Sequence, residues 1–110
     1  MKYSVVPTPK FKREAKRLIK KYTSLASELQ EFEKDLAENP RQGTSLGNNT
    51  YKIRLAIKSK GTGKSGGARI ITYLVTKELD IYLLAIYDKS EIENIDIKIL
   101  KRIIDDIDKK

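Results

Sequence analysis

The sequence has neither cysteine nor histidine among its 110 residues. The lack of cysteine excludes a disulfide framework and thiolate chemistry, and we take the cytoplasm as the default compartment. The lack of histidine excludes imidazole as a proton carrier and also excludes a histidine-ligated zinc site. Any acid–base chemistry must therefore use lysine, arginine, tyrosine, aspartate or glutamate.

Long apolar runs are also missing. No run approaches the roughly 20 apolar residues that span a bilayer. Residues 1–6 are followed at once by Pro7, Pro9 and a lysine-rich segment, which does not fit a signal peptide. With 39% apolar and 35% charged residues, the composition is that of a soluble protein. We expect one domain over residues 1–110, without a membrane partner.

Acidic residues are absent from one long segment in the middle of the chain. Between Glu38 and Glu78 there is no aspartate or glutamate, and the formal net charge of the whole chain is +8. A run of positive charge without counter-charges indicates an anionic partner, with nucleic acid first and an acidic protein or a membrane surface next. The cationic residues of this segment are Arg41, Lys52, Arg54, Lys58, Lys60, Lys64, Arg69 and Lys77.

Hydrophobic periodicity predicts a strand and two helices in the first part of the chain. A short strand is expected over residues 2–6, and Thr8 and Pro9 have the residue types of an N-cap and a first helical position. After this first helix, a second is expected to begin after Thr23 or Ser24. Two amphipathic helices joined by about two residues predict an antiparallel hairpin that lies on a sheet.

Three strands and a helix are predicted after this hairpin. The strands are expected over residues 51–58, 68–75 and 81–87, with residues 41–50 as a loop before them. The final helix is expected to end in Lys109 and Lys110. Its cap is either Ser90 with Glu93 or Asp96. We therefore expect an α+β fold, with a small, mainly antiparallel sheet of about four strands, an N-terminal helical hairpin packed on it and a C-terminal helix, in the order β-α-α-β-β-β-α. Because residues 51–58 alternate, Lys52 and Arg54 should lie on an open sheet face.

A glycine-rich basic loop joins the first two strands of this predicted trio. Its Gly63-Lys64-Ser65 run resembles the end of a phosphate-binding loop, but Lys58 stands where that pattern needs a glycine, and a strand rather than a helix follows. Nucleotide hydrolysis is therefore rejected. The loop is either a solvated hairpin tip or part of an anion site. The arginines on the neighbouring strands, Arg54 and Arg69, favour the anion site because a guanidinium binds phosphate through two N–H groups.

Three motifs resemble those of the RelE/ParE superfamily, and more narrowly the HigB-like RelE toxins of bacterial type II toxin–antitoxin modules. They are Lys52-Ile53-Arg54, the run from Gly63 to Tyr73, and Leu84-Ala85-Ile86-Tyr87-Asp88-Lys89-Ser90-Glu91. The resemblance covers nearly the whole chain, since the expected element order also matches. It implies a ribosome-dependent, metal-independent endoribonuclease that cuts messenger RNA in the ribosomal A site and is held inactive by an antitoxin.

The resemblance also implies the site residues and the partners. By motif, the catalytic residues are Arg54, Lys64, Arg69, Tyr87 and Lys89. Lys52, Lys58 and Lys60 are expected to contact phosphate. The implied partners are a HigA-like helix-turn-helix antitoxin, the 70S ribosome and messenger RNA. No cofactor and no metal are expected, and the free toxin is expected to be a monomer.

The roles within this site stay open at the level of the sequence. Arg54 and Arg69 suit the charge of a pentacoordinate phosphorane. The base is either Tyr87 or Lys64, provided that the clustered cations depress a pKa ordinarily near about 10, and either Lys89 or an arginine serves the leaving oxygen. Three other functions remain as alternatives: a ParE-like inhibitor of DNA gyrase, an RNA-binding domain without activity, and a magnesium-dependent nuclease using the carboxylates of residues 88–93.

Overall fold

The computed structural model describes residues 2–92 and 94–109. Glu93 and Lys110, which belong to the predicted capping pair and the predicted end of the last helix, lie outside the described residues. None of the described helices is long and apolar enough to cross a bilayer. In chain order the elements are β1 (Ser4–Pro7), α1 (Pro9–Lys21), α2 (Leu25–Glu38), β2 (Thr44–Gly47), β3 (Thr50–Leu55), β4 (Ala68–Val75), β5 (Asp80–Asp88) and α3 (Ile97–Asp108).

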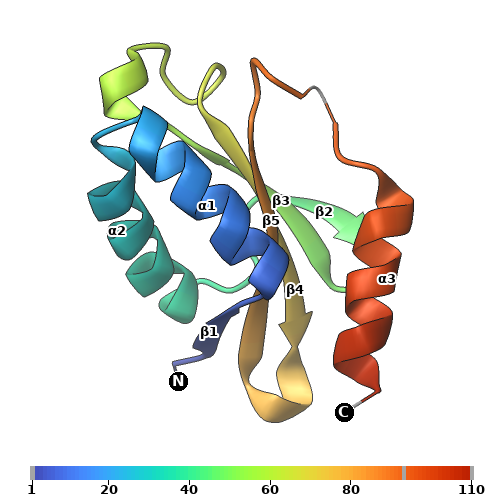
Figure 1. The fold of residues 1–110 in the computed structure, drawn as a ribbon. Helices are drawn as coiled ribbons and strands as arrows, with labels where there is room; N and C mark the ends of the chain where they lie inside the picture. The colour runs from blue at the N-terminus through green and yellow to red at the C-terminus, as the bar shows by residue number, and fades with distance from the viewer. Residues whose placement is uncertain (1, 93, 110) are drawn as a thin grey trace.

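The strands form one twisted sheet in the order β1-β5-β4-β3-β2 (Figure 1). β1 pairs in parallel with β5, and the other three pairs are antiparallel. The predicted α+β fold is confirmed. β5 lies between β1 and β4 and is buried on both faces, which explains why its sequence is apolar without alternation.

The fifth strand, β2, lies in the stretch for which the sequence predicts a loop, so that prediction is wrong. All four residues of β2 are exposed, and the strand therefore lacks the alternation of apolar and polar residues that would reveal it. Its pairing with β3 is made by a tight turn in which Asn48 and Asn49 have φ angles of 51° and 60°. Asparagine tolerates this left-handed conformation better than most residues.

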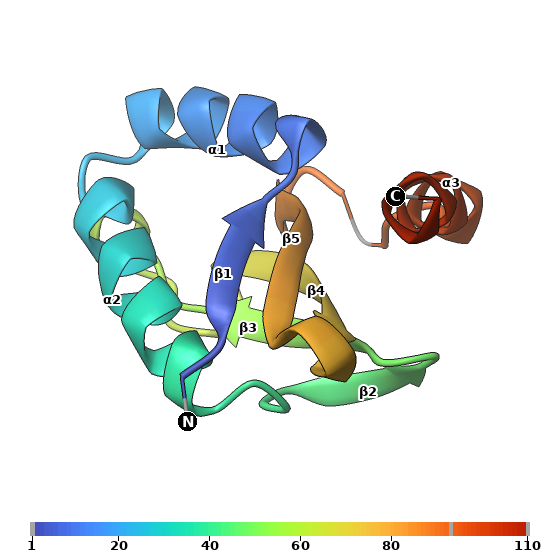
Figure 2. The ribbon, with the colours of Figure 1, turned by 90° about the horizontal axis from the view of Figure 1, so that it is seen from below.

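The helical hairpin of α1 and α2 covers one face of the sheet, as predicted (Figure 2). Thr8 caps α1: its hydroxyl accepts a hydrogen bond from the Phe11 N–H and also donates to the Leu83 carbonyl of β5 at 2.8 Å. The cap therefore fixes α1 on the sheet as well as starting the helix. The buried residues of this layer include Leu18, Leu25, Leu36, Ile53, Ile70, Leu83 and Ile86.

The second face of the sheet is partly covered by α3, which Figure 2 shows on the side opposite the hairpin. The open face was predicted for Lys52 and Arg54 of β3, and there Arg54 is exposed and Lys52 is half-buried. Ile71 of β4 and Leu84 of β5 point to this face and are buried, and Leu100 of α3 packs on them. Asp96 is the N-cap of α3 and accepts a hydrogen bond from the Lys98 N–H, which confirms one of the two predicted caps.

Thr72, at the centre of β4, supplies a test of the packing. Its side chain is fully buried, and its hydroxyl has no hydrogen-bond partner among the described residues. Because a buried hydroxyl without a partner is destabilising, we expect Thr72→Val to raise the free energy of unfolding by about 1 kcal/mol, measured by urea denaturation. Thr50→Val is the matched control. The Thr50 hydroxyl donates to the Gly47 carbonyl at 2.6 Å, so this change should destabilise. A destabilised Thr72→Val protein would contradict the assignment of Thr72 as a buried hydroxyl without a hydrogen-bond partner.

Candidate nucleic-acid interface

Three residues that are far apart in the sequence form one row across the sheet. Arg54 of β3 lies opposite Arg69 of β4, and Arg69 lies opposite Tyr87 of β5. Residues opposite each other on neighbouring strands share a face, with Cβ atoms about 5 Å apart. The strand register therefore brings together three of the five residues predicted to be catalytic.

Lys52 extends this row into a small cationic surface. It lies two residues before Arg54, on the same face, and opposite Ile71 of β4. Arg54 is exposed, whereas Lys52 is half-buried. Neither forms an ion pair with any of the described residues. We call Lys52, Arg54, Arg69 and Tyr87 the basic face.

Arg69 is buried, with 6% of its surface exposed, and its guanidinium shapes the glycine-rich loop. It donates to the carbonyls of Lys64 (2.9 Å), Ser65 (3.0 Å) and Ala68 (3.2 Å). Three of its five N–H donors are thus used inside the protein, and no carboxylate among the described residues neutralises it. Arg69 therefore holds the loop while keeping a full positive charge next to Arg54 and Tyr87.

The base of the loop is fixed by close backbone contacts at Gly67. A Cβ atom on this glycine would lie 2.2 Å from the Leu55 carbonyl oxygen, so only glycine lets the backbone before β4 approach the end of β3 this closely. The Gly67 carbonyl also accepts a hydrogen bond from the Lys89 N–H at 3.0 Å. Lys89, a predicted catalytic residue, is thereby held where β5 ends beside the loop.

The remaining predicted cations divide between the loop and the opposite face. The side chains of Lys58 and Lys64 are exposed, and the Lys58 N–H donates to the Glu28 carboxylate of α2 at 2.9 Å. Lys60 is different, because its ammonium forms an ion pair with Asp88 at 2.5 Å on the face of the sheet that α1 and α2 cover. The structure therefore does not bring Lys60 to the basic face.

Asp88 is the centre of this buried polar cluster, and its side chain has no exposed surface. It accepts hydrogen bonds from the Tyr22 hydroxyl, the Lys60 ammonium and both the N–H and hydroxyl of Ser90. Burial raises the pKa of the Asp88 carboxyl, but these hydrogen bonds outweigh burial and hold the pKa well below its usual range. Asp88 is thus a carboxylate that joins α1, the loop after β3 and the end of β5.

Glu91 makes a second link between the turn after β5 and α1. Its carboxylate accepts two hydrogen bonds from the Arg17 guanidinium, at 2.8 and 3.2 Å, and one from Lys21 at 3.4 Å. The hydrogen bond from Arg17 is the main reason that the pKa of Glu91 is lowered. Arg17 and Lys21 of α1 are therefore paired with this turn.

Tyr87 lacks the lowered pKa that its predicted role as a base requires. Only 2% of its surface is exposed. Burial raises the pKa of the Tyr87 phenol, and the neighbouring Arg69 charge lowers it by a smaller amount. Tyr87 is therefore a neutral phenol at physiological pH, able to donate a proton or a hydrogen bond.

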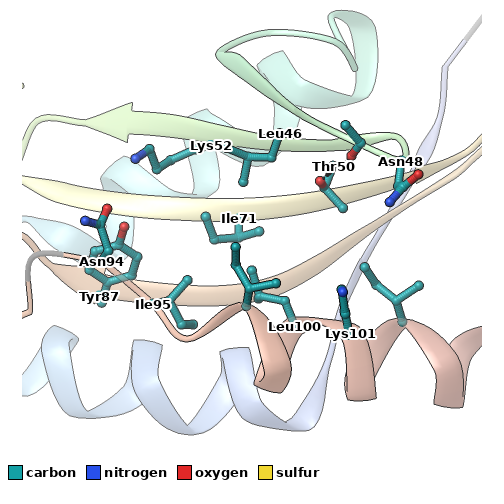
Figure 3. Close-up of a pocket in the computed structure, with 13 residues that line it drawn as sticks. Leu46, Asn48, Thr50, Lys52, Ile71, Tyr87, Asn94, Ile95, Leu100 and Lys101 are labelled. Atoms are coloured by element: carbon teal, nitrogen blue, oxygen red, sulfur yellow. Dashed lines mark hydrogen bonds between the residues drawn. The ribbon is translucent and has the colours of Figure 1, made fainter.

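A pocket of about 610 Å³ opens beside the basic face, between the β2–β3 hairpin and α3 (Figure 3). Lys52 and Tyr87 line it together with residues that the sequence did not single out, among them Leu46, Asn94 and Lys101. Asp88, Tyr22 and this pocket are the features that sequence reasoning missed. The one available signal was Asp88 itself, a carboxylate at the end of an otherwise apolar strand.

No family model matches the chain. Its fold resembles solved structures of RelE toxins. The isolated RelE toxin of E. coli superposes with a TM-score of 0.61 at 17% identity, over 92% of this chain and 98% of that chain. A chain of the RelBE2 toxin–antitoxin complex of Mycobacterium tuberculosis gives 0.60 at 18% identity, over 80% and 92%. A chain of the intact E. coli RelBE complex gives 0.60 at 16%, over 78% and 95%. The chain therefore has a RelE-like fold, and the narrower HigB-like resemblance stays a prediction.

The Asp88 cluster gives a pH-dependent prediction. Because the pKa of Asp88 is depressed below the unfolded value of about 3.9, its stabilising contribution is present above about pH 4 and is lost as the pH falls further. Asp88→Asn should remove this contribution and leave the partly buried Lys60 without its partner. We expect a loss of about 3 kcal/mol at neutral pH and a flatter decline of the unfolding free energy below about pH 5.

Urea denaturation of both proteins over this pH range measures the difference. Glu91→Gln is the control, because the Arg17 side chain is 55% exposed and the pair should contribute less than about 1 kcal/mol. Parallel pH profiles for the wild-type and Asp88→Asn proteins would contradict the role assigned to Asp88.

Proposed function

We propose that the chain is the toxin of a type II toxin–antitoxin module and acts as a ribosome-dependent, metal-independent endoribonuclease on messenger RNA. The observation that carries the proposal is the cross-strand row of Arg54, Arg69 and Tyr87, which places two arginines beside a phenol, with no ion pair to a carboxylate in the part of the chain that the structure describes. The RelE-like fold supports the same function, because the solved structures that it resembles are described as toxins.

The chemistry needs no group beyond RNA and protein side chains. A base takes the proton of the ribose 2′-hydroxyl, the 2′-oxygen bonds to the adjacent phosphorus, and the bond from phosphorus to the 5′-oxygen breaks. An acid gives the 5′-oxygen a proton, so the products are a 2′,3′-cyclic phosphate and a 5′-hydroxyl. Exposed Arg54 binds the phosphorane oxygens, and Arg69 adds a fixed positive charge. The raised pKa of Tyr87 favours a role as proton donor to the leaving oxygen. Of the two predicted bases, Lys64 is then the one that remains.

The proposal includes an antitoxin and a ribosome as partners. The complexes of E. coli and Mycobacterium tuberculosis with a similar fold each contain an antitoxin, and we infer one for this chain, of the HigA-like helix-turn-helix type. The protein's proton-transfer groups are few, so the ribosome would supply much of the orientation of the RNA. We place the free toxin in the cytoplasm as a monomer.

An RNA-binding domain without activity is the second candidate. It is favoured by the burial of Tyr87 and by the use of three Arg69 donors on the protein's own carbonyls. Such a domain would bind RNA tightly at low salt and lose affinity as salt rises. It would leave messages intact.

The test is inducible expression with mapping of messenger RNA ends, and a purified assay with and without ribosomes. We expect growth arrest and ribosome-dependent cuts from the wild type. Arg54→Ala and Tyr87→Phe should each lower the cleavage rate by about 100-fold or more, since each removes a donor to developing charge. Lys12→Ala, an exposed lysine of α1, is the control and should cut normally.

Other outcomes separate the alternatives. Arrest with intact messages and trapped gyrase–DNA complexes would replace the proposal by the ParE-like function. Cleavage that requires added magnesium would contradict the metal-independent mechanism. RNA binding without arrest or cuts would favour the inactive RNA-binding domain.

A further inference from the structure

The pocket beside the basic face has an apolar interior. Ile71 of β4 and Leu100 of α3 are buried residues that line it, and Leu46 and Ile97 line it from the hairpin and the helix. Leu46 and Ile97 are 46% and 64% exposed, so the pocket is open to solvent between them. At about 610 Å³ it is within the range of small-molecule sites.

Four polar or cationic side chains are placed around this interior. Lys52, Tyr87, Asn94 and Lys101 all line the pocket (Figure 3). None of them forms a side-chain hydrogen bond or ion pair with the described residues. Tyr87 is fixed by packing, since only 2% of its surface is exposed and it belongs to the buried cluster on which α3 packs.

The pocket is continuous with the basic face. Tyr87 belongs to both, since it ends the row that begins at Arg54, and Lys52 lies on the strand that carries Arg54. An RNA phosphate bound at Arg54 would therefore have the pocket next to it. The distance along the strand from Arg54 to Lys52 is two residues, or roughly 7 Å, which is about the spacing of consecutive phosphates in an extended single strand.

We propose that this pocket binds one unpaired nucleobase of the RNA next to the phosphate at the basic face, with Lys101 and Lys52 on the phosphate of that nucleotide. The inference rests on the proposed function and deepens it. A base has apolar faces that pack on Ile71 and Leu100, and a polar edge that meets the Asn94 amide. The ligand is thus a nucleotide of single-stranded RNA, and the pocket selects which message positions are cut.

The binding test uses nucleoside 5′-monophosphates as probes and the isoleucine methyl NMR signals of the purified protein as the readout. We expect saturable shifts at Ile71 and Ile104, which line the pocket, and none at Ile53 on the opposite face. Ribose 5-phosphate, which has no base, should bind at least 5-fold more weakly. Equal binding of ribose 5-phosphate and the nucleotides, or no shift at Ile71 and Ile104, would overturn the proposal.

A pair of lysines on α3 provides a matched control. Lys101 lines the pocket. Lys98, three residues earlier, is also exposed but does not line the pocket. Lys101→Ala should weaken nucleotide binding at least 5-fold, and Lys98→Ala less than 2-fold. Equal effects of the two changes would show general charge attraction only and would overturn the site. An acidic, apolar peptide that shifts these methyls while nucleotides do not would mark a protein-docking surface and would also overturn it.

Cleavage on the ribosome separates this inference from the proposed function. If the wild type cuts messages, Lys101→Ala should change the pattern of cut positions and Lys98→Ala should not. Cutting with an unchanged pattern would overturn the pocket's role and leave the proposed function standing. Nucleotide binding with the expected Lys101 dependence, but without any cutting, would support the pocket and overturn the endoribonuclease.

Discussion

The buried carboxylate of Asp88 is the interaction on which the arrangement of the site depends. It is fully buried, so it is stable only because Tyr22, Lys60 and Ser90 surround it with donors. These donors come from α1, from the turn after β3 and from the turn after β5. Because successive residues of a strand point to opposite faces, fixing Asp88 under the helices also fixes Tyr87 on the other face, at the end of the arginine row.

The Asp88 ion pair also keeps negative charge on one face of the sheet and leaves the other face positive. Asp88 and Glu91 are the carboxylates nearest in sequence to Tyr87, and both form ion pairs on the side of α1 and α2. Asp88 pairs with Lys60, and Glu91 pairs with Arg17 and Lys21. The basic face therefore keeps Arg54 and Arg69 without a carboxylate among the described residues. A site of this kind attracts phosphate, and its electrostatic field is set before any ligand arrives.

Much of this arrangement could be predicted from the sequence, because local signals determine it. The cap at Thr8, the alternation around Ile53 and the apolar run of β5 gave the element order, and the gap in acidic residues gave the basic segment. What could not be predicted depends on register and on side-chain contacts between distant segments. β2 has no buried residue to reveal it, the ion pair that removes Lys60 from the basic face joins residues 28 positions apart, and the pocket needs α3 in place.

Amide NMR shift mapping tests directly whether RNA phosphate binds at the basic face of the sheet. The ligand is a short single-stranded RNA in which 2′-hydroxyls are replaced by hydrogen, so that it cannot be cut. We expect salt-sensitive shifts centred on Lys52, Arg54 and Arg69 and on the loop between β3 and β4. Shifts confined to the outer face of α1, at Lys12, Lys16 and Lys20, would contradict binding at the basic face, because nucleic acid would then bind the helix and not the sheet.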